Sequence, residues 1–182
     1  MAMTDSKHSP FSLALSVIVV SADSGVALRD CVNSVLRSTL SLELILIDNA
    51  SRDGLPAAIE RAHANDARLQ VIYNHRNLGF GPAVNLAARR ARGQALLVLN
   101  PDCILAEDDL PRLLALLAGR PKAGLIGVAV ADAHGSVDPA SWRRDPLLRR
   151  SLNSMLDRPG ERSMSSSPFP PRSPRWRRYL AR

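Results

Sequence analysis

Short apolar runs that end abruptly on polar residues are the feature of this sequence that most restricts its fold. Short runs that are rich in Val, Ile and Leu and bounded by turn residues are typical of strands buried on both faces of a sheet. We therefore predict five strands. They cover residues 15–20, 43–47, 69–73, 95–99 and 124–131.

Segments with helical spacing of apolar residues separate these runs. We expect Ser24 to cap the first helix, whose apolar face carries Leu28, Cys31, Val32, Val35 and Leu36. Further helices are predicted over 55–64, over 82–92 with Pro82 in the first turn, and from Asp108 or Asp109 to 117, before Gly119. Strands that alternate with such helices indicate an α/β fold: a Rossmann-like, mostly parallel sheet with helices on both faces. The alternation stops near Asp138, so we expect the fold to be incomplete at its C-terminal side.

Carboxylates follow three of the predicted strands. Asp23 comes soon after the first, Asp48 directly after the second, and Asp102 closes the triplet that begins at Asn100 after the fourth. In an open α/β sheet, ligands bind outside the carboxyl ends of the strands, which makes these residues candidates for a site. The alternative that each Asp only caps the following helix stays open at this point.

Charge divides the chain into a neutral body and a basic tail. Up to Trp142 there are 13 Lys and Arg against 14 Asp and Glu, whereas from Arg143 onward there are 11 against 3. The tail, 143–182, is also rich in Pro and Ser without periodicity, so we expect disorder there, with a flexible N-terminus at 1–13 and one domain at 14–142. A linker or a shifted reading frame would both give this tail composition, and such a tail can contact an anionic membrane.

Several common site types are absent from the sequence. There is no Gly-x-Gly-x-x-Gly after the first strand and no Walker loop, the four histidines lack ligand spacing, and no Ser lies in a nucleophile elbow. Two cysteines are too few for a disulfide scaffold, and no apolar run approaches a membrane span. We therefore expect a protein of the cytoplasm, with peripheral contact at the inner face of the membrane through its Arg-rich tail and no specific nucleic-acid partner.

Four motifs, in order, resemble those of family 2 glycosyltransferases of the GT-A fold, in particular the bacterial rhamnosyltransferase-like branch. The family's Thr-Tyr-Asn turn is matched by residues 21–23 (Ser-Ala-Asp), and its Asp-Asn-Ala-Ser-x-Asp-Gly motif by residues 48–54. Its Asn-x-Gly-Phe motif is matched by residues 77–80, with Asn85 in the next helix, and its DXD-like triplet by residues 100–102 (Asn-Pro-Asp). The resemblance covers roughly residues 15–142.

The resemblance implies a site for a nucleotide-diphosphate sugar, UDP- or dTDP-linked. It implies that Asp48 accepts a hydrogen bond from the uracil or thymine ring and that Asp102 binds Mg²⁺ or Mn²⁺ bridging the diphosphate. At position 22, where the family has a base-stacking aromatic ring, this chain has Ala. The full set of expected donor-binding residues is Ser21, Asp23, Asp48, Asn49, Asn77, Gly79, Phe80, Asn85, Asn100 and Asp102.

The activity implied by the resemblance is inverting hexosyl transfer to a cell-surface polysaccharide or glycolipid. In such chemistry the metal stabilises the leaving diphosphate while a carboxylate base deprotonates the acceptor hydroxyl. The family's base lies in an acidic motif beyond the metal triplet, and the acids after Asp138 form no such pair. No catalytic residue is therefore assigned, and a non-catalytic binding or regulatory module with a basic, membrane- or polyanion-contacting tail is the alternative.

Overall fold

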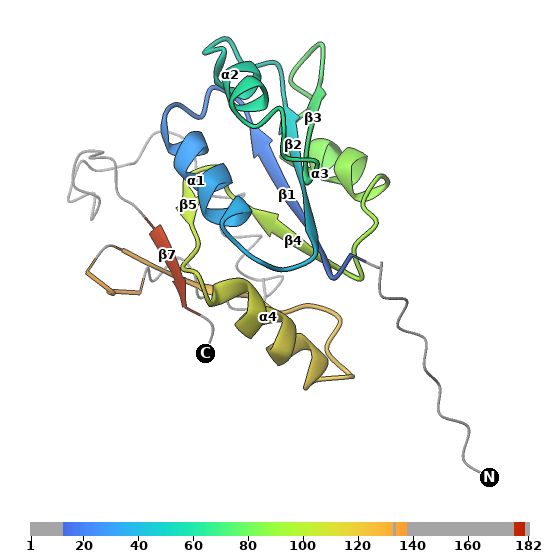
Figure 1. Ribbon diagram of the computed structural model, residues 1–182, viewed down its shortest axis with the longest axis vertical. Coiled ribbons are helices and arrows are strands. Elements are labelled where there is room, and N and C mark those ends of the chain that lie inside the picture. Colours follow the sequence, from blue (N-terminus) through green and yellow to red (C-terminus); the bar gives the residue numbers. More distant parts are fainter. Residues whose placement is uncertain (1–12, 133, 138–176, 181–182) are drawn as a thin grey trace, which may run out of the picture.

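A parallel α/β sheet forms the body of the chain in the computed structural model (Figure 1). The structure describes residues 13–132 and 134–137, and the backbone of 177–180. None of the helices in these ranges has the length and apolar character of a membrane span. The elements are β1 (Leu15–Ser21), α1 (Ala27–Leu36), β2 (Leu42–Asp48), α2 (Leu55–Ala62), β3 (Leu69–Tyr73), α3 (Phe80–Ala88), β4 (Ala95–Leu99), β5 (Cys103–Ile104), α4 (Asp109–Ala118), β6 (Ala129–Ala131) and β7 (Arg177–Leu180).

The main sheet has the strand order β3-β2-β1-β4, and all of its pairings are parallel. The first three strands end level with one another, because Ser21 pairs with Asp48 and Asp48 pairs with Tyr73. The connections that follow β1, β2 and β4 therefore leave the same edge of the sheet. This arrangement confirms the predicted Rossmann-like sheet and brings the polar strand ends together.

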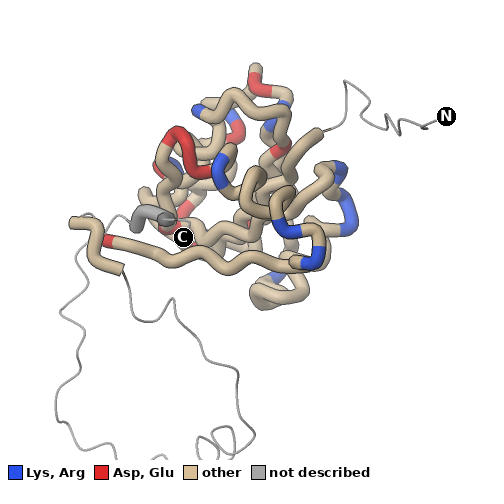
Figure 2. Tube along the Cα trace, turned by 90° about the horizontal axis from the view of Figure 1, so that it is seen from below, with Lys and Arg blue, Asp and Glu red and all other residues tan. Residues whose placement is uncertain are grey.

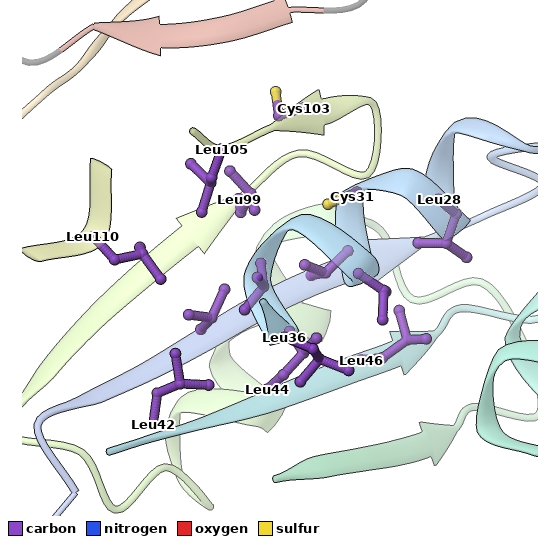
Figure 3. Close-up of a cluster of buried hydrophobic side chains, with 14 of the residues drawn as sticks. Leu28, Cys31, Leu36, Leu42, Leu44, Leu46, Leu99, Cys103, Leu105 and Leu110 are labelled. Carbon is purple, nitrogen blue, oxygen red and sulfur yellow. The ribbon is translucent and has the colours of Figure 1, made fainter. Parts of the chain in front are cut away.

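Helices cover both faces of this sheet, as predicted. Alternate residues of β1 and β2 point to opposite faces. On one face Val17 and Leu44 pack with residues of α1, α2 and α4, and Figure 3 shows this core. On the other face Ile18 and Ile45 pack against Ala83 and other residues of α3. Burial on both faces explains why β1 and β2 read as continuous apolar runs.

A network of hydrogen bonds around a buried carboxylate stabilises the end of the sheet opposite the polar strand ends. Glu43, only 4% exposed, accepts hydrogen bonds from the Ser16 hydroxyl (2.6 Å) and from the backbone and guanidinium of Arg92. Burial disfavours the charged carboxylate, but these hydrogen bonds outweigh it and lower the pKa of Glu43. The Gly93 N–H in turn donates to Ser16 Oγ (2.8 Å). The network therefore ties β1, β2 and the start of β4 together.

Several predicted boundaries differ from the observed ones. Ser24 does not cap α1: the N-cap position is Val26, and the Ser24 hydroxyl instead accepts from Ser21. Helix α3 begins at Phe80 and ends at Ala88 rather than spanning 82–92. Of the predicted strand 124–131 only β6 is a strand, and β5 was not predicted. The short second sheet, ordered β5-β7-β6, forms through distant parts of the chain, so local periodicity does not reveal it.

The predicted ends of the chain lie largely outside the described residues. This holds for most of the flexible segment 1–13, for the domain residues after Val137, and for most of the tail 143–182. Within that tail, Arg177–Leu180 form β7, which pairs parallel to β5 and antiparallel to β6. The expected disorder of the tail stays a prediction, because only these four of its residues are described.

Candidate functional site

A pocket of about 360 Å³ lies where β1, β2 and β4 end and the loop between β3 and α3 begins. Its volume lies within the range of small-molecule sites. None of the residues that line it is charged, and about half of them are polar. The lining residues are Val20, Ala22, Ser24, Asn49, Asn77, Gly79, Phe80, Asn100 and Pro101.

The loop after β1 is fastened to the loop after β2 by reciprocal hydrogen bonds. Asp23 Oδ1 accepts from the backbone N–H groups of Arg52 and Asp53, and Asp53 Oδ2 accepts from Gly25 N (3.2 Å). The Asp23 N–H donates to Ser51 Oγ (3.2 Å). These bonds hold Asp23 at φ 53°, a left-handed conformation that is uncommon outside glycine. Asp23 is thus occupied in positioning the loop that carries Ala22 and Ser24.

Asp48, at the end of β2, keeps one carboxylate oxygen available. The residue is 9% exposed, and Oδ1 accepts from the Ser51 N–H (2.8 Å). Within the described residues Oδ2 makes no hydrogen bond. The neighbouring Tyr73 hydroxyl donates to Glu60 (2.7 Å); burial, this bond and the charges of Glu60 and Asp48 raise the pKa of Tyr73 to about 12.

Asn49 connects β2 to the loop between β3 and α3. Its Nδ2 donates to Asn77 Oδ1 (2.8 Å) and to the carbonyl of Gly79 (3.4 Å). Its Oδ1 accepts from Asn74 Nδ2 and from Leu78 N, both at 3.0 Å. The hydrogen-bonding capacity of this buried amide is therefore used inside the protein. Asn49 shapes the pocket, while the Nδ2 group of Asn77 makes no hydrogen bond within the described residues.

The predicted metal triplet forms a tight turn after β4. The Cys103 N–H donates to the carbonyl of Asn100 (3.1 Å), with Pro101 at the second position of the turn, where its fixed φ is favourable. Asp102, at the third position, is exposed. No group of three or more His, Cys, Asp or Glu side chains within the described ranges could hold a metal ion. Asp102 therefore fits a metal only as one ligand, with others coming from a bound diphosphate, the arrangement Mg²⁺ often adopts.

Two buried thiols lie behind this turn. Cys31 Sγ lies 3.5 Å from the carbonyl of Asn100, and Cys103 Sγ lies 3.7 Å from Asp102 Oδ1. Burial, followed by the charges of Cys103 and Asp102, raises the pKa of the Cys31 thiol. Cys31 is thus a protonated core residue, as its apolar surroundings in the sequence predict.

The structure brings together part of the predicted site. Of the ten predicted donor-binding residues, five line the pocket: Asn49, Asn77, Gly79, Phe80 and Asn100. Ser21 is buried behind the pocket, and its hydroxyl donates to Ser24. Asp23 and Asp102 lie in the connections after β1 and β4, and Asp48 is the last residue of β2; none of the three lines the pocket. Asn85 is exposed one turn into α3 and does not line the pocket.

The prediction missed two kinds of residue. Val20 and Ser24 line the pocket but carried no distinct signal, because each also has an ordinary structural role as a strand end or a cap. Pro101 lies within the triplet at 100–102, but only its two neighbours were expected to bind the donor. Ser51 and Asp53, which bind the loop after β1, lie within the motif at 48–54. Their places in this motif, shortly after Asp48, could have identified them as residues that position the loop.

Comparison with known proteins identifies the family. The family described as Glycosyl transferase family 2 matches residues 16–160. The chain belongs to glycosyl transferase family 2. One relative is the N-acetylglucosaminyl-diphospho-decaprenol L-rhamnosyltransferase of Mycobacterium tuberculosis (strain H37Rv). The two sequences are 27% identical over 172 residues, and the match covers 88% of this chain and 52% of the relative. This chain is also 32% identical over 107 residues to the putative teichuronic acid biosynthesis glycosyltransferase TuaG of Bacillus subtilis, covering 58% of this chain and 42% of that protein. The chain thus spans about half the length of these relatives.

Solved structures confirm the GT-A type of fold for the part of it that this chain covers. S. aureus TarS 1–349 in complex with UDP-GlcNAc aligns with a TM-score of 0.55 and 22% identity, over 65% of this chain and 33% of TarS. The mannosyltransferase PcManGT from Pyrobaculum calidifontis, in complex with GDP-Man and Mn²⁺, aligns with a TM-score of 0.54 and 22% identity, over 64% and 34%. These neighbours bind nucleotide sugars, and PcManGT holds a divalent metal.

Proposed function

We propose that this family 2 chain binds a UDP- or dTDP-sugar in the pocket at the strand ends. The observation that carries the proposal is that residues from three separate family motifs, Asn49, Asn77 and Asn100, line one pocket. A pocket that is polar but uncharged suits the base, ribose and sugar of such a donor, which bind mainly through hydrogen bonds and apolar contact.

Asp48, beside the pocket, and Asn77, in its lining, each have an unused polar group that we propose for nucleotide recognition. The unused Oδ2 of Asp48 is an acceptor for the ring N–H that uracil and thymine share. The Nδ2 group of Asn77 is a donor for ribose or phosphate oxygens. By contrast, Asn49 acts as a positioning residue, because the protein itself uses both groups of its amide. Asp23 positions its loop through Oδ1, and within the described residues its Oδ2 makes no hydrogen bond.

The diphosphate requires positive charge that the pocket lining does not supply. No Lys or Arg is among the lining residues, and Asp102 adds negative charge beside Pro101. We propose that Asp102 holds Mg²⁺ or Mn²⁺ together with the diphosphate, where the cation stabilises the departing nucleotide diphosphate. In Figure 2 the red Asp and Glu segments lie mainly in the left half, where some blue Lys and Arg segments adjoin them, and further blue segments line the right edge.

For the reaction, we propose inverting hexosyl transfer to a cell-surface polysaccharide or glycolipid acceptor. The names of the relatives support this class of acceptor, since one acts on a decaprenol-linked substrate and another is placed in teichuronic acid biosynthesis. In this proposal the described residues bind the donor. A transfer assay with lipid-linked acceptors measures whether this chain also completes the reaction.

Isothermal titration calorimetry tests the donor site. We expect UDP- or dTDP-sugars to bind in the presence of Mn²⁺, and Asp102→Ala to remove the dependence on Mn²⁺. Glu107→Ala, which removes another exposed carboxylate outside the pocket, is the matched control and should bind as the unchanged chain does. Absence of binding would refute the donor site, and binding indifferent to Asp102 would refute the metal assignment.

We also propose that the basic tail contacts anionic membranes. Residues 143–182 carry 11 Lys and Arg against 3 Asp and Glu, enough for electrostatic attraction to an anionic surface. Binding to vesicles of anionic phospholipid should fall steeply as salt is raised and should be absent with neutral vesicles. Binding that persists at high salt would contradict an electrostatic contact.

A further inference from the structure

Phe80 is an aromatic side chain left half exposed at the pocket. It lines the pocket, and 52% of its surface is accessible. Aromatic side chains gain much of their stabilising effect from burial, so a ring kept in water at a concave site suggests a role in contacting a ligand.

The position of Phe80 on α3 explains this exposure. Residues 80, 83 and 87 lie on the same face of a helix. Ala83 and Ala87 are fully buried against Ile18, Val20 and other residues of the sheet. Phe80, in the first turn of α3, lies on the same helix face but does not belong to this core. Val20 is the last core residue of β1 and also lines the pocket, so the core and the pocket adjoin at this residue. The sheet-facing side of α3 therefore continues past the sheet at Phe80, over the pocket.

The rest of the lining leaves the ring face of Phe80 without an aromatic partner. From β1 and the loop that follows it, the pocket receives the small side chains of Val20, Ala22 and Ser24. Gly79, which precedes Phe80, has φ 81°, and no side chain there obstructs access to the ring. The pocket lining therefore has one aromatic side chain, and the small side chains on the β1 side leave room for a ligand beside it.

We propose that Phe80 is the stacking surface for the nucleobase of the donor. This inference rests on the proposed function and adds the residue that supplies most of the base affinity. A planar heterocycle can lie offset over the ring, with its edge N–H directed to a carboxylate such as Asp48. Stacking on an aromatic side chain tolerates different bases, so Phe80 provides affinity and the polar groups provide selectivity.

Affinity measurements with UMP and with ribose 5-phosphate test this assignment, because the two probes differ by the base. Phe80→Leu keeps an apolar side chain at a half-exposed position, so the chain should fold, and it should raise the Kd for UMP about tenfold. The Kd for ribose 5-phosphate should not change. Phe80→Trp should retain UMP affinity, and fluorescence of the new Trp should be quenched when UMP binds. Leu125→Ala, which shortens an 87% exposed side chain outside the pocket, is the control.

Three results would overturn the assignment in different ways. An unchanged UMP affinity in Phe80→Leu, with an unchanged response to a UDP-sugar, would show that the ring contacts no part of the donor. A loss for the UDP-sugar but not for UMP would place the ring against the sugar instead. If the unchanged chain binds neither UMP nor any UDP-sugar, the proposed function itself fails.

Discussion

Replacing Asn49 by Ala should destabilise the protein by about 2 kcal/mol. Asn49 is 2% exposed, and its side chain takes part in four hydrogen bonds. Asn77 and Gly79, which accept from Nδ2, are exposed and can bond to water instead. Asn74 and Leu78, which donate to Oδ1, are half buried, so their two donors lose a partner at about 1 kcal/mol each.

Thermal and denaturant unfolding followed by circular dichroism measures this loss. For a chain of this length, about 2 kcal/mol corresponds to a fall in Tm of about 4–8 °C. Asn85→Ala is the matched control, since Asn85 is exposed and its side chain makes no hydrogen bond within the described residues. Asn49→Asp keeps the acceptor but directs a carboxylate oxygen at Asn77 Oδ1, so it should also be less stable than the unchanged chain.

The outcome also bears on the pocket. Because Asn49 fastens the loop that carries Asn77 and Gly79, Asn49→Ala should weaken donor binding as well as stability. If Asn49→Ala unfolds at the same denaturant concentration as Asn85→Ala, the hydrogen bonds of Asn49 do not stabilise this loop and the reasoning is wrong.

Three further changes have defined outcomes. The pKa of Glu43 is lowered in the folded state, so its contribution to the free energy of unfolding should be full above its unfolded pKa and should fall as pH drops through the folded pKa. Acid unfolding curves of Glu43→Gln should show a smaller loss of stability over this pH range. Gly93→Ala should destabilise the protein by about 3 kcal/mol or more in denaturant unfolding, since its Cβ would collide with the backbone of Ser16. Spectrophotometric titration should show Tyr73 ionising near pH 12, and Glu60→Gln should lower that pKa.

The strand-end residues illustrate how far sequence reasoning reached into the site. The regular spacing of strands and turns predicted that Asp23, Asp48 and Asp102 would collect at one edge of the sheet, and they do. Their individual tasks were not predictable. Asp23 is held by backbone N–H groups of a loop 29 and 30 residues away, and only the fold sets such distant contacts.

The sequence by itself determined the main sheet, because each buried strand and each amphipathic helix has a local periodicity that burial requires. Strands β3 and β4 coincide with their predicted bounds for this reason. The tertiary structure alone decided which groups remain available to a ligand. Asn49 and Asp48 are neighbours in one motif, yet packing of the loop before α3 uses the whole amide of Asn49 and leaves one oxygen of Asp48 unused. Hydrogen-bond partners across loops depend on where the chain returns in space, which local sequence does not encode.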